Sequence, residues 1–126
     1  MPEGPRERLR AALSAALRQR DSARVAVFRT ALAALDNAEA VPVGEHDPGS
    51  LALEATPVGL GAREAARRQL SEEDVVFVVR AEISDRLVAA DVYEEAGRHE
   101  HARRLREEAD MLASAAGLPR PPTASP

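Results

Sequence analysis

The chain has 126 residues, of which 44% are hydrophobic but only 2% aromatic, so its core has to consist mainly of leucine, valine and alanine. Such a composition suits closely packed helices better than a β-sandwich. Cysteine and lysine are both absent. Thiolate nucleophiles, zinc–thiolate sites, Schiff bases and phosphate-loop lysines are therefore excluded. We expect a single all-α domain without a self-contained catalytic site of any common type.

The net charge of −4 is unevenly distributed along the chain. Residues 1–30 carry seven arginines against Glu3, Glu7 and Asp21, a net charge of +4, whereas residues 31–126 carry a net charge of −8. A basic N-terminal part on an acidic body is consistent with contact between that part and nucleic acid.

No apolar stretch approaches the roughly 20 residues that span a bilayer. Residues 1–10 are polar and lack the apolar stretch of a signal peptide. We therefore expect a cytoplasmic protein without membrane contact.

The first two helices are predicted at residues 5–20 and 22–40. In the first, apolar residues recur at the spacing of one helical face, at Leu9, Ala12, Leu13, Ala16 and Leu17. Asp21 and Ser22 then offer side chains that can cap the second helix. Because apolar residues cover most of that second helix, we expect it to be central and buried.

Proline and glycine recur in residues 41–61 and predict a flexible loop, after which a short helical turn is possible at 62–69. Ser71 to Asp74 form a capping-box pattern at the start of a third helix, which Gly97 ends. An apolar stripe follows this helix, and we expect its N-terminal end, with Val75, Phe77 and Val78, to be buried as well.

A fourth helix is predicted at residues 98–116, with a near-heptad repeat of alanine and leucine, and Gly117 ends it. The proline-rich residues 118–126 are expected to be a disordered tail. Short connections within each helix pair predict two helical hairpins joined by the long loop, in one domain of residues 1–117.

Potential catalytic and metal-binding residues form no convincing cluster. His99 and His101 are two residues apart and point to different sides of a helix, and His46 lies in the loop. Acidic residues occur as sequence neighbours, which diverge around a helix, whereas acid–base catalysis needs two carboxylates in one cleft. We therefore expect no catalytic residue, no metal site and no cofactor.

A set of polar residues on the second and third helices is less easily assigned to the surface. Glu82 and Arg86 are four residues apart on the third helix, which also carries Tyr93, and Arg29 and Asn37 lie on the second. Polar groups on crowded helices need partners. Two interpretations stay open: an interhelical network that fixes the packing, or a binding site.

Two stretches of the sequence resemble the YqeY-like proteins of the GatB/YqeY family. The first stretch, residues 20–39, contains the motifs RD, R, FR and NAE in the order in which the family has them. The second stretch, residues 70–112, begins with LSEEDV. It also contains YEEAGR, which is followed by a helix with regularly spaced leucines. The residues of these stretches that we assign to a family-motif polar network are Arg29, Asn37, Glu82, Arg86, Tyr93 and Arg98. The arginine bias is typical of a high-GC bacterial branch.

The resemblance implies a helical N-terminal domain that is followed, in the family, by a smaller domain similar to the tRNA-associated tail of the GatB amidotransferase subunit. Here residues 113–118 run into the proline-rich end, so the resemblance covers the N-terminal domain only. It also implies carbon–nitrogen ligase activity with glutamine as amido-N-donor. Glutamine hydrolysis in that complex uses a Ser–Ser–Lys arrangement, which a chain without lysine cannot supply.

Three functional hypotheses follow. The first is a non-catalytic accessory or adaptor protein, associated with tRNA or translation, whose candidate phosphate contacts are Arg6, Arg10, Arg18, Arg20 and Arg24. The second is a helical protein-interaction module without an RNA role. The third is a component of a glutamine-dependent carbon–nitrogen ligase complex, in which Asn37, Glu82, Arg86 and Tyr93 line a site that another subunit completes.

Overall fold

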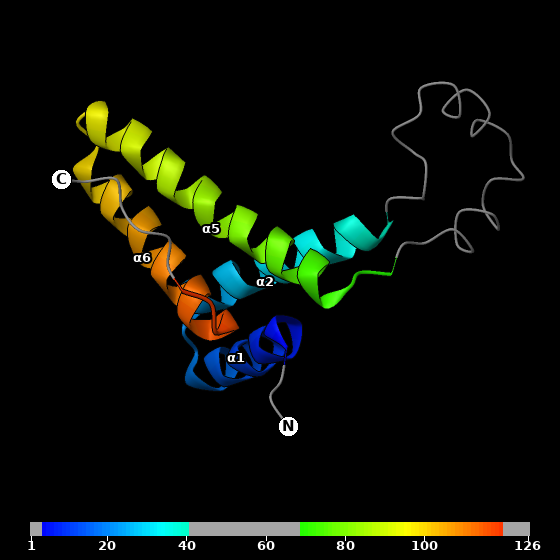
Figure 1. The fold of residues 1–126 in the computed structure, drawn as a ribbon. Coiled ribbons are helices and arrows are strands. Elements are labelled where there is room, and N and C mark those ends of the chain that lie inside the picture. The colour runs from blue at the N-terminus through cyan, green and yellow to red at the C-terminus, as the bar shows by residue number, and fades with distance from the viewer. Residues whose placement is uncertain (1–3, 41–68, 120–126) are drawn as a thin grey trace, which may run out of the picture.

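The computed structural model describes residues 4–40 and 69–119, and within these ranges the chain forms four helices and no strand. The helices are α1 (Pro5–Gln19), α2 (Ser22–Ala40), α5 (Glu72–Glu95) and α6 (His99–Ala116) (Figure 1). The expected all-α bundle is therefore confirmed, with helix ends within about one residue of their predicted positions. No helix of this part of the chain is long and apolar enough to cross a membrane.

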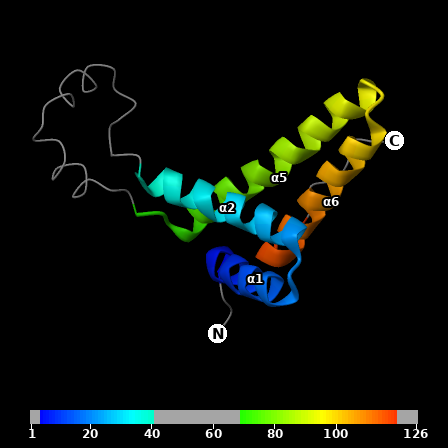
Figure 2. The same cartoon turned by 180° about the vertical axis from the view of Figure 1, so that it is seen from behind.

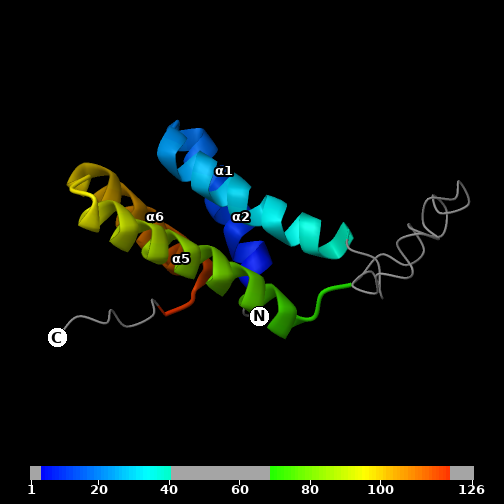
Figure 3. The same ribbon diagram turned by 90° about the horizontal axis from the view of Figure 1, so that it is seen from above.

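The four helices form a long hairpin with a shorter pair packed against its open end. α5 and α6 lie side by side and antiparallel, whereas α1 and α2 pack near the start of α5 and the end of α6 (Figures 1 and 2). α2 crosses over α1 at an angle, as the view from above shows (Figure 3). The turn between α5 and α6 therefore projects beyond α1 and α2. The predicted loop at 41–61 lies outside the described residues.

Local sequence signals explain where α5 and α6 begin and end. The Ser71 hydroxyl accepts a hydrogen bond from the Asp74 amide, and the Asp74 carboxylate accepts one from the Ser71 amide, both at 3.1 Å. This is the predicted capping box. Gly97 and Gly117 adopt left-handed conformations, with φ of 81° and 74°, and end α5 and α6 as expected. Leu118 packs against the core, so it belongs to the bundle; residues 120–126 lie outside the described part.

The connection between α1 and α2 is equally short. Arg20 adopts a left-handed conformation, with φ of 57°, which is uncommon for a residue with a side chain. Asp21 then caps α2, because its carboxylate accepts a hydrogen bond from the Arg24 amide at 3.1 Å. The chain therefore reverses within two residues, which brings α1 and α2 together.

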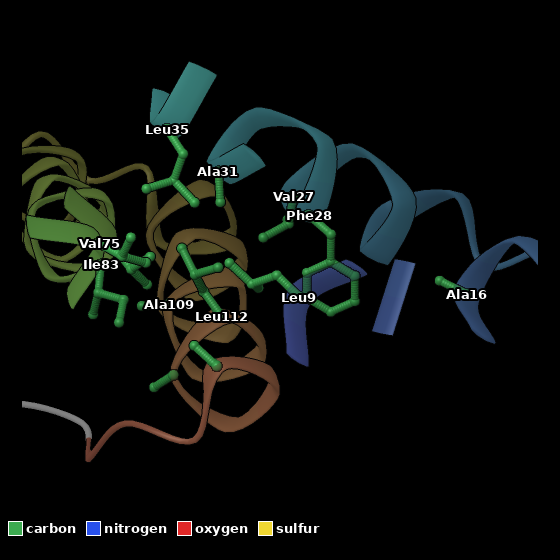
Figure 4. Packing of buried hydrophobic residues seen from close by; sticks show 13 residues of the cluster. Leu9, Ala16, Val27, Phe28, Ala31, Leu35, Val75, Ile83, Ala109 and Leu112 are labelled. Carbon is green, nitrogen blue, oxygen red and sulfur yellow. The ribbon is translucent and has the colours of Figure 1, made fainter. Parts of the chain in front are cut away.

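All four helices contribute aliphatic side chains to one core (Figure 4). Phe28 is the aromatic residue in this cluster and is only 2% exposed. The largest side chains that are fully buried are Leu9, Leu35, Val79, Ile83 and Leu112. The predicted apolar face of α6 and that of α1 meet here with Val79 and Ile83 of α5, which is the expected way for amphipathic helices to bury apolar area. Leu17, predicted on the buried face of α1, is instead 47% exposed, because it lies in the last turn of the helix.

Two predictions about burial are wrong. α2 is not surrounded: Val27, Phe28, Ala31 and Leu35 are buried, but the opposite side of the helix is exposed. A bundle of four helices covers each of them on one side only, and the exposed positions of α2 are alanines together with polar and charged residues, all of which tolerate water. Phe77, expected to be buried, is 74% exposed, because the core-facing residues at this end of α5 are Val75 and Val79.

Candidate functional site

The five candidate phosphate-binding arginines fall into two groups. The first group consists of arginines that are paired with acidic residues of the bundle, and Arg6 belongs to it. Its guanidinium donates a 2.6 Å hydrogen bond to Glu39 and lies 3.8 Å from Asp36, and only 15% of its side chain is exposed. Arg6 therefore joins α1 to α2, and its charge is already neutralised.

Arg24 is also engaged. Its guanidinium donates a hydrogen bond to Asp21 at 3.1 Å, and it borders a surface hollow with Glu107 and Asp110 of α6. Hydrogen bonds from the Arg24 amide and then from its guanidinium hold the pKa of Asp21 below its ordinary value of 3.8. Arg24 thus lies among carboxylates, which compete with any phosphate.

The other three arginines are exposed, and we refer to them together as the α1 arginine surface: Arg10, Arg18 and Arg20. Within the described part of the chain, no ion pair or hydrogen bond engages their guanidinium groups. Arg10 and Arg18 are eight residues apart, about 12 Å along the helix. Arg20 follows directly at the left-handed end of α1. These three side chains are available to an external anion.

The polar residues of α5 form an interhelical ion-pair network. Arg86 donates to the Glu82 carboxylate at 3.1 Å, to the Glu82 carbonyl at 3.0 Å, and to Glu108 of α6 at 3.3 Å. Its side chain is only 13% exposed. Because all three acceptors belong to the bundle, this cluster matches the packing interpretation of these residues.

A second polar cluster lies at the turn between α5 and α6. Arg106 donates hydrogen bonds to Glu94 at 2.9 Å and to Asp91 at 3.1 Å, and His99 is hydrogen-bonded to the same Glu94. The hydrogen bond from Arg106, followed by that of His99, holds the pKa of Glu94 below its ordinary value of 4.5. This cluster ties the projecting end of the hairpin together.

Tyr93 belongs to this end of the molecule as well. Its ring stacks on His101, with 4.0 Å between ring centroids, and the Arg98 guanidinium lies 5.9 Å from the ring centroid. The tyrosine and arginine of the YEEAGR run therefore shape the turn. Both histidines of α6 have a partner there, and the described residues contain no group of three potential metal ligands. His46 lies outside those residues.

The structure does not bring the remaining network candidates into one cleft. Glu82 and Tyr93 are eleven residues apart, about 16 Å along α5. Arg29 and Asn37 are exposed on α2, and no ion pair or hydrogen bond engages their side chains in the described part of the fold. A site that uses Asn37, Glu82, Arg86 and Tyr93 together has no counterpart in this arrangement.

One surface feature was missed in the sequence. Phe77, Val88 and Val92 of α5 are 74%, 63% and 60% exposed. With Ala81 and Ser84 they follow a helical spacing of three and four residues along one side, and we call these five residues the α5 outer stripe. The sequence contains a signal for this feature. Phe77, Val88 and Val92 repeat at helical spacing, in addition to the apolar residues of the same helix that pack into the core.

Comparison with known proteins yields no match: neither a protein-family model, nor a curated protein, nor a solved structure corresponds to this chain. The resemblance to the GatB/YqeY family therefore rests on the motif residues alone. The protein is a small helical bundle with exposed arginines on α1 and exposed apolar side chains along one side of α5.

Proposed function

We propose that this protein is a non-catalytic adaptor that contacts RNA through the α1 arginine surface, and that tRNA is the RNA concerned. One observation carries the proposal: Arg10, Arg18 and Arg20 are exposed, and their guanidinium groups are engaged by no ion pair within the described part of the chain. Guanidinium groups match the geometry of phosphate oxygens and bind them in a bidentate way.

The charge of the molecule limits the form of such contact. The overall charge is −4, so long-range attraction to RNA is weak, and binding has to depend on the local arginines. Contacts of this type fix the position of the RNA backbone and do not read its sequence. The family resemblance, with its link to a tRNA-dependent amidotransferase, supports tRNA as the target and bacterial translation in the cytoplasm as the setting.

The non-catalytic part of the proposal has separate support. The chain has no lysine or cysteine, and the Arg86 and Arg106 clusters are ion pairs between α5 and α6. In the alternative, in which the chain is a component of a glutamine-dependent ligase complex, another subunit has to supply the reactive groups. Release of ammonia from glutamine by the purified chain alone would contradict our proposal.

The test is a filter-binding titration of the purified chain with tRNA over a range of salt concentrations. We expect affinity at low salt that falls as salt rises, because each arginine–phosphate contact releases counterions. Absence of binding at low salt, or affinity that does not change with salt, contradicts RNA contact through arginines.

A further inference from the structure

The α5 outer stripe (Phe77, Ala81, Ser84, Val88 and Val92) lies on the side of α5 that faces away from the core. The buried residues of the same helix are Val75, Val79, Ile83 and Ala90, which lie about half a turn away. α5 therefore has two apolar sides, and only one of them is covered in this structure. Large apolar side chains exposed along one side of a helix, here Phe77, Val88 and Val92, commonly mark a binding surface.

The dimensions of the stripe suit a single helix as partner. It extends over fifteen residue steps, about 22 Å, or four helical turns. Large side chains lie at its ends, whereas the middle has the small residues Ala81 and Ser84, which allow a second helix to approach closely. Beside Phe77, a hollow of about 340 Å³ is bordered by Val76 and Arg80 and by the acids Glu72 and Glu73. An apolar side chain of a partner helix fits such a hollow.

The charges beside the stripe indicate the chemistry of that partner. α5 carries eight acidic residues against two arginines, and one of these arginines, Arg86, is held by Glu82 and Glu108. The exposed residues at the borders are Glu73, Asp85, Asp91 and Glu95, with Arg80 as the exposed base. A helix that covers the stripe therefore meets an acidic border, which favours lysine or arginine on its flanks.

The same charges disfavour a second copy of this chain as the occupant. If two α5 helices pack antiparallel through the stripe, Glu73 of one copy lies opposite Glu95 of the other, and each copy brings four exposed border acids against the single exposed base Arg80. If they pack parallel, each acidic residue faces its own equivalent. Both arrangements place like charges together, which is unfavourable at a helix interface.

We propose that the α5 outer stripe is the docking site for a basic amphipathic helix of a partner protein. The partner helix places apolar residues at three- and four-residue spacing on the stripe and basic residues along the acidic borders. This inference does not depend on RNA contact, which uses the arginines of α1. Together the two surfaces give the adaptor two separate binding partners.

The test uses a defined probe on the full chain. The probe is a fluorescent synthetic peptide of about 18 residues, with leucines along one helical face and lysines on the others. A second peptide with the same leucines, but glutamates in place of the lysines, is the charge control. Binding is followed by fluorescence anisotropy, and the mass of the free chain in solution is measured by light scattering.

We expect the lysine peptide to bind and the glutamate peptide to bind much more weakly. Val88→Asp places a charge in the middle of the stripe and is expected to weaken binding by roughly tenfold or more. Leu17→Asp, at an exposed apolar position on α1, is the matched control and leaves binding unchanged. If circular dichroism shows that Val88→Asp is unfolded, the double variant Phe77→Ser with Val92→Ser replaces it.

Four results overturn the proposal. The first is no binding of the lysine peptide, and the second is equal binding of the lysine and glutamate peptides. The third is a loss of peptide affinity in Leu17→Asp as large as that in Val88→Asp. The fourth is a dimer of the free chain that Val88→Asp converts to a monomer, because the stripe is then occupied by a second copy. Failure of tRNA binding leaves these readouts unaffected, so the two proposals fail independently.

Discussion

Arg6 in the first turn of α1 and Glu39 at the end of α2 are joined by a hydrogen bond of 2.6 Å. Both side chains are largely buried, with 15% and 24% of their surfaces exposed. The contact spans 33 positions in the sequence and fixes the open ends of the α1–α2 pair. Arg6 therefore has a structural role that its position among exposed arginines does not reveal.

The substitution Arg6→Gln separates this role from RNA contact. We expect the free energy of unfolding to fall by about 1 kcal/mol, because a charged hydrogen bond between two helices is lost. Affinity for tRNA is expected to stay at the wild-type value. Urea denaturation and filter binding measure the two effects; a loss of tRNA affinity at unchanged stability would assign Arg6 to the RNA surface instead.

Arg86 is expected to matter more for stability than an exposed arginine. Arg86→Leu leaves Glu82 and Glu108 without their shared partner, and we expect a loss of about 1–2 kcal/mol in the free energy of unfolding. Arg103→Leu, whose ion pair with Glu100 is exposed, is the control and should leave the urea midpoint unchanged. Equal effects of the two substitutions would contradict the interhelical role of Arg86.

Gly97 offers a measure of backbone strain at the projecting turn. Its φ of 81° disfavours side chains, yet a Cβ atom there would meet no atom within 4 Å. Gly97→Ala should therefore cost about 1 kcal/mol of stability for conformational reasons alone. Gly97→Asn should cost less, because asparagine tolerates this conformation better. If thermal unfolding shows that the Gly97→Ala and Gly97→Asn variants lose equal stability, the left-handed conformation of Gly97 is not the cause of the loss.

Acidification should weaken the end of the hairpin. The pKa of Glu94 is lowered in the folded state, mainly by the hydrogen bond from Arg106, from its ordinary 4.5. Its stabilising contribution is therefore complete above that ordinary pKa and is lost as the pH falls through the lower, folded-state value. We expect the urea midpoint of Glu94→Gln to be less sensitive to pH in this acidic range than that of the wild type. Identical pH profiles would show that the Arg106 contact does not contribute.

The helix ends were predictable because their signals are local. The Ser71 box, the Asp21 cap and the two left-handed glycines each act within a few residues of the chain. The repeats of α1 and α6 likewise identify most of their buried residues, with Leu17 of α1 as an exposed exception. These features need no knowledge of the neighbouring helices.

The environments of individual side chains were less predictable because they depend on distant neighbours. Phe77 and Val75 are both apolar residues at the start of α5, and only the position of α2 and α6 decides which of them is buried. Similarly, no local pattern distinguishes Arg6, which meets Glu39, from Arg10, which stays exposed. The candidate RNA surface was therefore predicted by residue type, and the structure reduces it to three of the five arginines.

The most direct test of RNA contact is the salt dependence of tRNA affinity in two variants of equal charge. One replaces Arg10, Arg18 and Arg20 by glutamine; the other replaces Arg80, Arg103 and Arg104, which are exposed on α5 and α6. We predict that the first variant loses most of its affinity, and that its plot of log affinity against log salt becomes flatter by roughly 2–3 units. The second variant should bind like the wild type. Equal loss in both variants would show that net charge alone governs binding and would contradict the proposed α1 arginine surface.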